Sequence, residues 1–205
     1  MTKSKLIQET INLFKNFPSV GPKTAERFTY YLLNNPEILE SFVLILQQLK
    51  EKIVKCRYCN DFSDNDPCKI CSDNMRDKKI LCIVEKHQDV YAIESTEYKG
   101  LYYILSSIIH PLEGKTIKDF DLDLLVKRIK NVPEEFMPQE IIIATSLTTE
   151  GELTANYIIE YLKSKNISIK ISRIAKGLPT GADIEYSDPQ TLSFAIKNRI
   201  EVKNE

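Results

Sequence analysis

The sequence has no long apolar run. No window of its 205 residues approaches the roughly 18 consecutive apolar residues that a transmembrane helix needs. Residues 1–5 lead into an amphipathic pattern with polar interruptions, not into the apolar core of a signal peptide. We therefore expect a cytoplasmic protein without a membrane partner. In that compartment thiols stay reduced, so disulfides are excluded.

Several catalytic signatures are also missing. The stretch "GPKT" at residues 21–24 lacks the leading glycine of a P-loop, and Pro22 separates its glycine from its lysine. The chain has only two histidines, and we expect both His87 and His110 at the surface or at a helix cap, not as ligands. None of the ten tyrosines has the neighbourhood of a nucleophile. The sequence predicts no catalytic residue.

Cysteine is scarce, yet four of the five cysteines lie in "CRYCNDFSDNDPCKIC", residues 56–71. A redox dithiol needs one Cys-x-x-Cys pair at a helix N-terminus, whereas two facing pairs offer four thiolates in a tetrahedron. Such a set does not by itself choose between zinc and a rubredoxin-like iron. We predict one structural zinc ion per protomer, because four protein ligands leave no open position for catalysis. The predicted ligands are Cys56, Cys59, Cys68 and Cys71.

Residues 1–55 have helical periodicity throughout. Gly21 lies in a tight turn between the first two expected helices, where backbone amides point outward and are available to a phosphate. Lys23 and Arg27 are four residues apart and share a helix face beside this turn. The arrangement resembles a helix-hairpin-helix, a sequence-independent binder of the DNA backbone, although Ser19 stands where the motif usually has a second glycine. The alternative is a helical hairpin that only packs.

A third helix is expected to begin after Asn35, as N-cap, with Pro36 at its first position. Its predicted buried stripe consists of Ile38, Phe42, Ile45, Leu46 and Leu49. Residues 1–55 hold eight Lys or Arg and five Glu, a net charge of +3, whereas the whole chain has a net charge of −1. The positive charge is therefore concentrated in this helical arm.

Beyond the cysteines, short apolar runs alternate with helical stretches, a pattern typical of parallel βαβ units. The runs are "KILCIVE", "LYYIL", "EIIIAT" and "SIKISRI". Cys82, inside the first run, is expected to be a buried small hydrophobic residue. In such sheets the chemistry lies beyond the carboxyl ends of the strands. Glu85 and Glu150 are expected to meet at that edge, with Glu152 as a third acidic residue.

The strand that ends in Glu85, followed by a helix and later by a strand with an acidic loop, resembles a Toprim domain. Toprim enzymes use this glutamate for acid–base chemistry and an Asp-x-Asp pair to hold magnesium. Here "SLTTEGE", residues 146–152, supplies no such pair. We therefore expect an edge that binds a partner protein through Glu85, Glu150 and Glu152. The alternative is a magnesium-dependent nuclease or a primase-like enzyme.

The last distinctive stretch is "SRIAKGLPTGADIEYSDPQTL", residues 172–192. Its glycines and Pro179 predict a tight loop, and a closing helix should begin at Pro189 with Ser187 or Asp188 as its cap. Two interpretations remain open: a turn that precedes the last helix, or a functional loop.

The order of these motifs resembles the RecR family of bacterial recombination mediators along essentially the whole chain. The resemblance implies a nucleoid-associated accessory protein of recombinational repair that binds single- and double-stranded DNA and works with RecO and RecF. It also implies dimers or ring-like tetramers that encircle DNA and help to load recombinase. The tail corresponds to a family motif called Walker B-like. The expected α/β chain comprises a helix-hairpin-helix arm (1–55), a four-cysteine zinc finger (56–71), a Toprim domain (79–175) and a tail with a helix (176–205).

Overall fold

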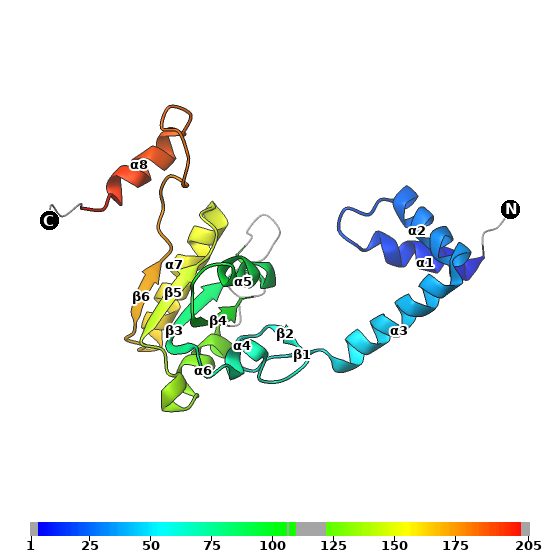
Figure 1. The fold of residues 1–205 in the computed structure, drawn as a ribbon, viewed down its shortest axis with the longest axis horizontal. Coiled ribbons are helices and arrows are strands. Elements are labelled where there is room, and N and C mark those ends of the chain that lie inside the picture. Colours follow the sequence, from blue (N-terminus) through cyan, green and yellow to red (C-terminus); the bar gives the residue numbers. More distant parts are fainter. Residues whose placement is uncertain (1–3, 106, 110–121, 202–205) are drawn as a thin grey trace. The chain divides into compact units, whose positions relative to one another are not determined.

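The computed structural model describes residues 4–105, 107–109 and 122–201. The chain divides into two compact units, Met1–Ile53 and Val54–Glu205 (Figure 1). Within the described ranges, no helix is both long enough and apolar enough to cross a bilayer.

The first unit consists of three helices, α1 (Lys5–Lys15), α2 (Pro22–Asn34) and α3 (Pro36–Lys52). Pro22 and Pro36 occupy first helical positions, where the missing amide hydrogen has no helical partner to lose. Only Ile11, Ala25 and Thr29 of these helices are buried. The core of this unit is therefore small.

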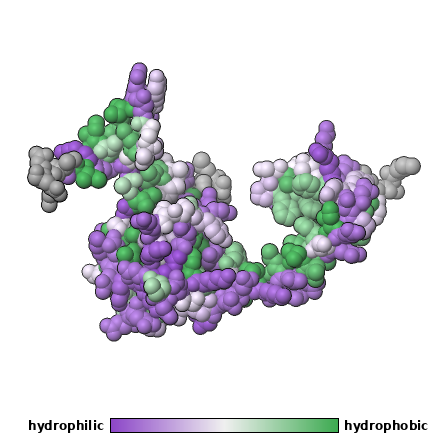
Figure 2. All heavy atoms as spheres, viewed as in Figure 1, coloured by the Kyte–Doolittle hydropathy of each residue, from purple (hydrophilic) through white to green (hydrophobic). Residues whose placement is uncertain are grey.

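The prediction of a buried stripe on the third helix is wrong, because no residue of α3 is buried. The exposed fractions of the predicted stripe are Ile38 42%, Phe42 42%, Ile45 58%, Leu46 48% and Leu49 58%. Figure 2 shows this apolar surface in green along α3. Asn35 does precede the helix, but its side chain donates to the Tyr31 carbonyl of α2 at 2.7 Å and does not cap α3.

The second unit is built on a parallel four-stranded sheet in the order β4-β3-β5-β6, which confirms the predicted α/β class. Its strands are β3 (Asp77–Val84), β4 (Gly100–Ile104), β5 (Glu140–Ala144) and β6 (Lys170–Arg173). Val84 pairs with both Ile104 and Ala144, so three strands end at the same edge. The loops that follow β3 and β5 therefore meet there.

Helices cover both faces of the sheet (Figure 1). The helices α6 (Asp123–Lys130) and α7 (Thr149–Ser164) pack on the face that includes Leu81 and Ile83. The helix α5 (His87–Glu94) packs on the opposite face, against Cys82 and Val84. This alternation along β3 is the period of two that strand geometry requires. Cys82 is 2% exposed, as predicted, and burial raises the pKa of its thiol to about 12.

Small elements complete this unit: β1 (Val54–Lys55), β2 (Phe62–Ser63), α4 (Lys69–Ser72), the 3-10 turn η3 (Glu134–Phe136) and α8 (Pro189–Lys197). The strands β1 and β2 form an antiparallel pair beside the cysteines. Asp188 caps α8, because its Oδ1 accepts hydrogen bonds from the amides of Gln190 and Thr191. Of the two caps considered, the aspartate is the one used.

Candidate functional site

The hairpin between α1 and α2 presents both predicted cations to solvent. Lys23 and Arg27 are exposed, and neither forms an ion pair within the described residues. A Cβ atom at Gly21 would meet nothing within 4 Å, so the space over this residue is open. Ser19 adopts a φ of 64°, the left-handed conformation that glycine accepts most readily. The place of the missing second glycine is thus the strained position of this turn.

The start of α2 offers unsatisfied backbone donors. Gly21, the N-cap, has no capping side chain, and the first helical hydrogen bond runs from the Ala25 amide to the Gly21 carbonyl at 3.0 Å. The amides of Lys23 and Thr24 precede that bond and belong to the first turn, whose donors have no helical acceptor. Together with the positive end of a 13-residue helix dipole, they suit an anion such as a phosphate.

The four predicted cysteine ligands lie together. Cys56, Cys59, Cys68 and Cys71 are all buried, and their sulfur atoms lie within 4.8 Å of one another. The Sγ atoms of Cys59 and Cys68 are 3.5 Å apart. For comparison, a tetrahedron with Zn–S bonds of about 2.3 Å has edges of roughly 3.8 Å. The amides of Cys68 and Cys71 each donate to a cysteine sulfur at 3.4 Å, which favours the thiolate form.

These thiols cannot all ionise together without a cation. Hydrogen bonds with Cys59, and then with Cys68 and Cys71, lower the pKa of Cys56. Hydrogen bonds with Cys56, Cys59 and Cys68, followed by burial, raise the pKa of Cys71. A divalent cation removes this conflict, because it binds four thiolates at once. The residues present therefore fit a structural metal ion.

Hydrogen bonds attach the cysteine knuckle to the sheet. The Ile104 amide, at the end of β4, donates to the Cys59 carbonyl at 2.9 Å. In return, Asn60 Nδ2 donates to the Ile104 carbonyl at 2.9 Å. His87, at the start of α5, pairs through Nδ1 with Asp61 Oδ1 at 2.7 Å, so it contacts the knuckle without joining the cluster of ligands. His110 lies outside the described residues.

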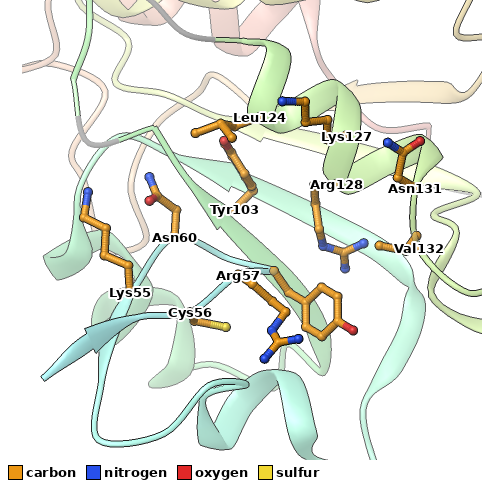
Figure 3. A pocket seen from close by; sticks show the side chains of 11 residues that line it. Lys55, Cys56, Arg57, Asn60, Tyr103, Leu124, Lys127, Arg128, Asn131 and Val132 are labelled. Atoms are coloured by element: carbon orange, nitrogen blue, oxygen red, sulfur yellow. The ribbon is translucent and has the colours of Figure 1, made fainter. Parts of the chain in front are cut away.

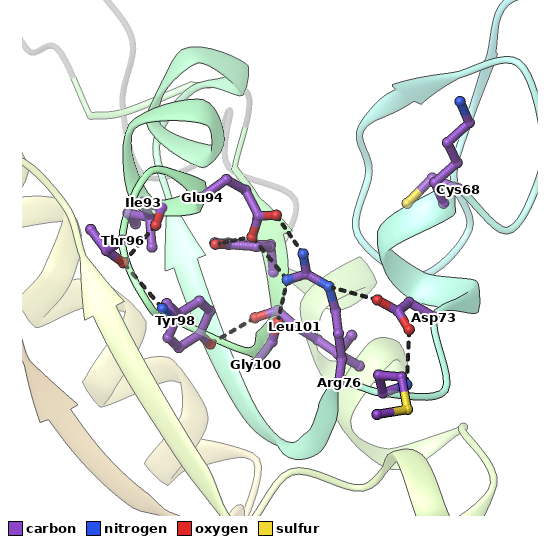
Figure 4. Close-up of polar contacts among 12 residues, drawn as sticks. Cys68, Asp73, Arg76, Ile93, Glu94, Thr96, Tyr98, Gly100 and Leu101 are labelled. Carbon is purple, nitrogen blue, oxygen red and sulfur yellow. Dashed lines mark hydrogen bonds and ion pairs between the residues drawn. The ribbon is translucent and has the colours of Figure 1, made fainter.

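A second attachment is a polar network around Arg76 (Figure 4). Arg76 Nη1 donates to Glu94 Oε1 at 2.8 Å and to the Gly100 carbonyl at 3.1 Å, and its Nη2 forms an ion pair with the same carboxylate. Tyr102 donates its hydroxyl to Glu94 Oε1 at 2.7 Å. The Arg76 guanidinium holds the pKa of Glu94 below its usual range, although burial opposes this. The network joins the segment after the cysteines to α5 and β4.

At the carboxyl edge of the sheet, Glu85 is 5% exposed. Its Oε1 accepts from the Ser146 amide at 2.7 Å and from the Ser146 hydroxyl at 2.9 Å. Thr148 caps α7 by accepting from the Gly151 amide at 3.2 Å. A Cβ at Gly151 would lie 2.1 Å from the Ser146 carbonyl oxygen, so this loop requires glycine there. The loop that stands in place of an Asp-x-Asp pair therefore occupies one oxygen of the Glu85 carboxylate.

The other two acidic residues differ in their partners. Glu152 forms ion pairs with Arg173 at 2.6 Å and with Lys176 at 2.7 Å. Burial raises the pKa of Glu152, but the two cations outweigh burial and the net pKa is lowered. Glu150 is partly exposed and has no ion pair within the described residues. Of the three predicted residues, Glu150 has the carboxylate left for a partner.

The comparisons with known proteins agree with this architecture. Three family models match: the RecR zinc-finger domain of the four-cysteine type over residues 53–73, "Toprim domain" over residues 79–175 and "RecR, C-terminal" over residues 177–200. The Recombination protein RecR of Amoebophilus asiaticus is 42% identical over 199 residues, 96% of each chain. The same protein of Staphylococcus aureus strain MRSA252 is 40% identical over 198 residues, 96% of this chain and 97% of that protein. The chain belongs to the RecR family. Its Toprim domain and its four-cysteine zinc-finger domain are thereby confirmed.

The RecR C-terminal segment contains the glycine- and acid-rich loop. Asp183 organises this loop, because its carboxylate accepts from the Glu185 amide and its carbonyl from the Ser187 hydroxyl. Gly181 has a φ of 82°, so a residue with a side chain would be strained there. Tyr186 remains 83% exposed. Acidic residues of this loop thus have structural roles, while an aromatic residue faces solvent.

The sequence analysis missed two arginines beside the RecR zinc-finger segment. Arg76 carried no signal apart from its closeness to the cysteines. Arg128 did carry one, because it falls on the apolar face of a helix whose other residues on that face are Leu125 and Ile129. Arg128 is 4% exposed.

Proposed function

We propose that this member of the RecR family is a non-enzymatic DNA-binding mediator of recombinational repair, active in the cytoplasm at the nucleoid. The observation that carries the proposal is the exposed α1–α2 hairpin, with Lys23 and Arg27 lacking ion pairs within the described residues, beside the open space over Gly21. These groups reach phosphates and present nothing that reads base edges, so binding is independent of sequence and includes single- and double-stranded DNA.

The test is charge reversal at the hairpin. Lys23→Glu combined with Arg27→Glu is expected to abolish binding to every single- and double-stranded sequence alike, measured by fluorescence anisotropy at physiological salt. The matched control is Lys163→Glu with Lys197→Glu, an equal change in charge on exposed residues of α7 and α8. Circular dichroism and metal content should stay as in the wild type. If the hairpin variant binds DNA normally, the hairpin only packs and the proposal fails.

We also propose that the four cysteines hold one zinc ion per protomer. The buried tetrad, its spacing and the match to a four-cysteine zinc-finger domain support this assignment. The role of the metal is structural, because all four ligands come from the protein.

For the acidic edge, the proposed partner is RecO, which acts together with RecF to load recombinase on single-stranded DNA. Glu150 is the main contact, because Glu85 and Glu152 are engaged by Ser146 and by Arg173 with Lys176. Glu150→Lys is expected to weaken RecO binding in calorimetry and to leave DNA affinity unchanged. Glu160→Lys, on an exposed position of the same helix, is the control. Unchanged RecO affinity in Glu150→Lys would assign this edge another role.

The proposed mediator encircles DNA as a clamp. A clamp of this kind requires more than one protomer, and the proposed oligomer is a dimer or tetramer of this chain. Exposed apolar residues on α3 support it, since surface patches of this kind mark interfaces.

The alternative, a magnesium-dependent Toprim enzyme, is supported by the match to that domain. It is disfavoured by the hydrogen bonds that occupy Glu85. Incubation of single- and double-stranded DNA with Mg²⁺ or Mn²⁺ decides between them: cleavage that Glu85→Gln abolishes would establish the enzyme.

A further inference from the structure

A cavity of about 430 Å³ lies in the second unit, between the cysteine knuckle and α6 (Figure 3). Its lining includes four cationic side chains and no carboxylate: Lys55, Arg57, Lys127 and Arg128. The first two come from the knuckle and the others from α6, so residues about 70 positions apart in the sequence converge on one space. None of its lining residues belongs to the hairpin or is one of the acidic residues Glu85, Glu150 and Glu152.

Arg128 is the buried member of these four cations. It is 4% exposed, and among the residues that the structure describes, one of its five N–H donors has an acceptor: Nη1 donates to the Phe136 carbonyl at 3.2 Å. Its Nε is buried without a hydrogen-bond partner among the described residues. A buried guanidinium without a carboxylate is costly. The negative charge of the Cys71, Cys59 and Cys56 thiolates offsets part of that cost, and an anion in the cavity would offset more of it.

The remaining cations differ in availability. Arg57 is paired with Asp66 at 2.9 Å, so its charge is largely balanced. Lys55 and Lys127 are exposed, and neither forms an ion pair within the described residues. Four metal-bound thiolates would place negative charge behind the wall that Cys56 forms. For an entering anion, the positive charges of Lys55, Lys127 and Arg128 oppose the repulsion from these thiolates.

We propose that this cavity is a phosphate-binding site whose ligand is a backbone phosphate of DNA, a second contact in addition to the hairpin. The inference rests on the proposed DNA-binding function and deepens it. A planar guanidinium flanked by two ammonium groups is the donor set that phosphate recognition uses. Because the proposed function is DNA binding, we assign the phosphate to the DNA backbone.

The aromatic residues of the cavity do not offer a base-stacking platform. Tyr58 stacks on Phe136 with ring centroids 5.6 Å apart, and Arg128 lies 5.7 Å from the Tyr58 ring centroid. Tyr103 is 5% exposed. Tyr103 is therefore covered, and Tyr58, which is partly exposed, has Phe136 and Arg128 beside its ring. We expect the cavity to take the charged group and to leave the base outside, which agrees with sequence-independent binding.

The test uses full-length protein with Lys55→Glu and Lys127→Glu combined, against a control with Lys163→Glu and Lys197→Glu. All four positions are exposed, and the control residues do not line the cavity. Duplex affinity is measured between 50 and 200 mM salt. The cavity variant should bind every sequence about tenfold more weakly. The slope of log affinity against log salt concentration should decrease in magnitude by roughly 0.9 for each phosphate contact that the cavity loses. The control should keep the slope of the wild type.

A second readout uses inorganic pyrophosphate and an oligoglutamate peptide as probes, each titrated calorimetrically into wild type, cavity variant and Arg128→Lys. Pyrophosphate binding that both variants weaken supports the site. If the cavity variant keeps the wild-type salt dependence of DNA affinity, the assignment to DNA is overturned. Pyrophosphate binding by the wild type would then indicate a free phosphate as the ligand. Oligoglutamate binding by the wild type would instead indicate an acidic peptide. Loss of DNA binding in the hairpin variant alone would leave the proposed function intact and refute only this inference. Absence of DNA binding in the wild type would refute both.

Discussion

At the scale of single residues, Ser19 has a backbone conformation that is unfavourable for a residue with a side chain. Its φ of 64° costs a residue with a Cβ roughly 1 kcal/mol relative to glycine. Ser19→Gly should therefore raise the free energy of unfolding of the helical unit by up to about 1 kcal/mol, offset in part by the greater entropy of the unfolded chain. Urea denaturation followed by circular dichroism measures this, and DNA affinity should not fall. A destabilised Ser19→Gly variant would mean that the serine side chain contributes to the turn.

At the scale of elements, the Arg76–Glu94 pair fixes the post-cysteine segment to α5 and β4. Because Arg76 lowers the pKa of Glu94 from about 4.5, the ionised carboxylate stabilises the fold above the unfolded pKa. That stabilisation is lost as the pH falls below 4.5 through the folded pKa. Glu94→Gln should cost about 1–3 kcal/mol at pH 7, and the difference from wild type should shrink in acid.

Urea unfolding at pH 7 and at about pH 4 tests this expectation, with exposed Glu97→Gln as the control. Both variants keep the four cysteines, so release of metal in acid affects them equally. A cost for Glu94→Gln that stays constant with pH would assign the effect to packing instead of charge.

Sequence patterns predicted which helices and strands form, but they did not predict all of the contacts that these elements make. The β-branched runs predicted the parallel strands, since only burial on both faces favours residues such as Ile141–Ile143. Periodicity likewise identified α3, but it could not tell a face buried in the same chain from one left exposed. The two Cys-x-x-Cys pairs predicted the ligand cluster from spacing alone. Arg128 and the occupied state of Glu85 depend on contacts between distant segments, which local patterns do not encode.

At the scale of the whole molecule, removal of the metal tests how much the knuckle contributes. A zinc site with four cysteine ligands contributes on the order of 10 kcal/mol to an isolated finger and less within a larger fold. Cys56→Ser should lose the zinc and lower the Tm by about 10 °C. Cys82→Ala removes a buried cysteine outside the cluster, so it should keep one zinc per protomer in elemental analysis. Freshly purified wild type without metal, or an unchanged Tm for Cys56→Ser, would contradict the zinc assignment.

In the proposed oligomer, the exposed face of α3 is the contact between copies of the chain. Ile45 and Leu49 are each 58% exposed, so charges at these positions should leave the fold of one protomer intact. In the proposed oligomer they are covered by a second copy, where buried charges are costly. Ile45→Asp with Leu49→Asp should therefore reduce the solution mass to the 23.6 kDa of one chain, measured by light scattering, while the wild type has a multiple of it. Gln47→Asp, on an exposed polar position of α3, is the control and should assemble normally.

The same variant connects assembly to DNA binding. A single hairpin makes few phosphate contacts, whereas linked copies raise the effective concentration and can increase affinity by about 10²-fold or more. The monomeric variant should thus bind duplex DNA about 10²-fold more weakly and with a shallower salt slope, although Lys23 and Arg27 are unchanged. A double variant that keeps the wild-type mass would exclude α3 as the interface. One that is monomeric yet binds DNA as tightly as the wild type would show that retention on DNA does not depend on a clamp.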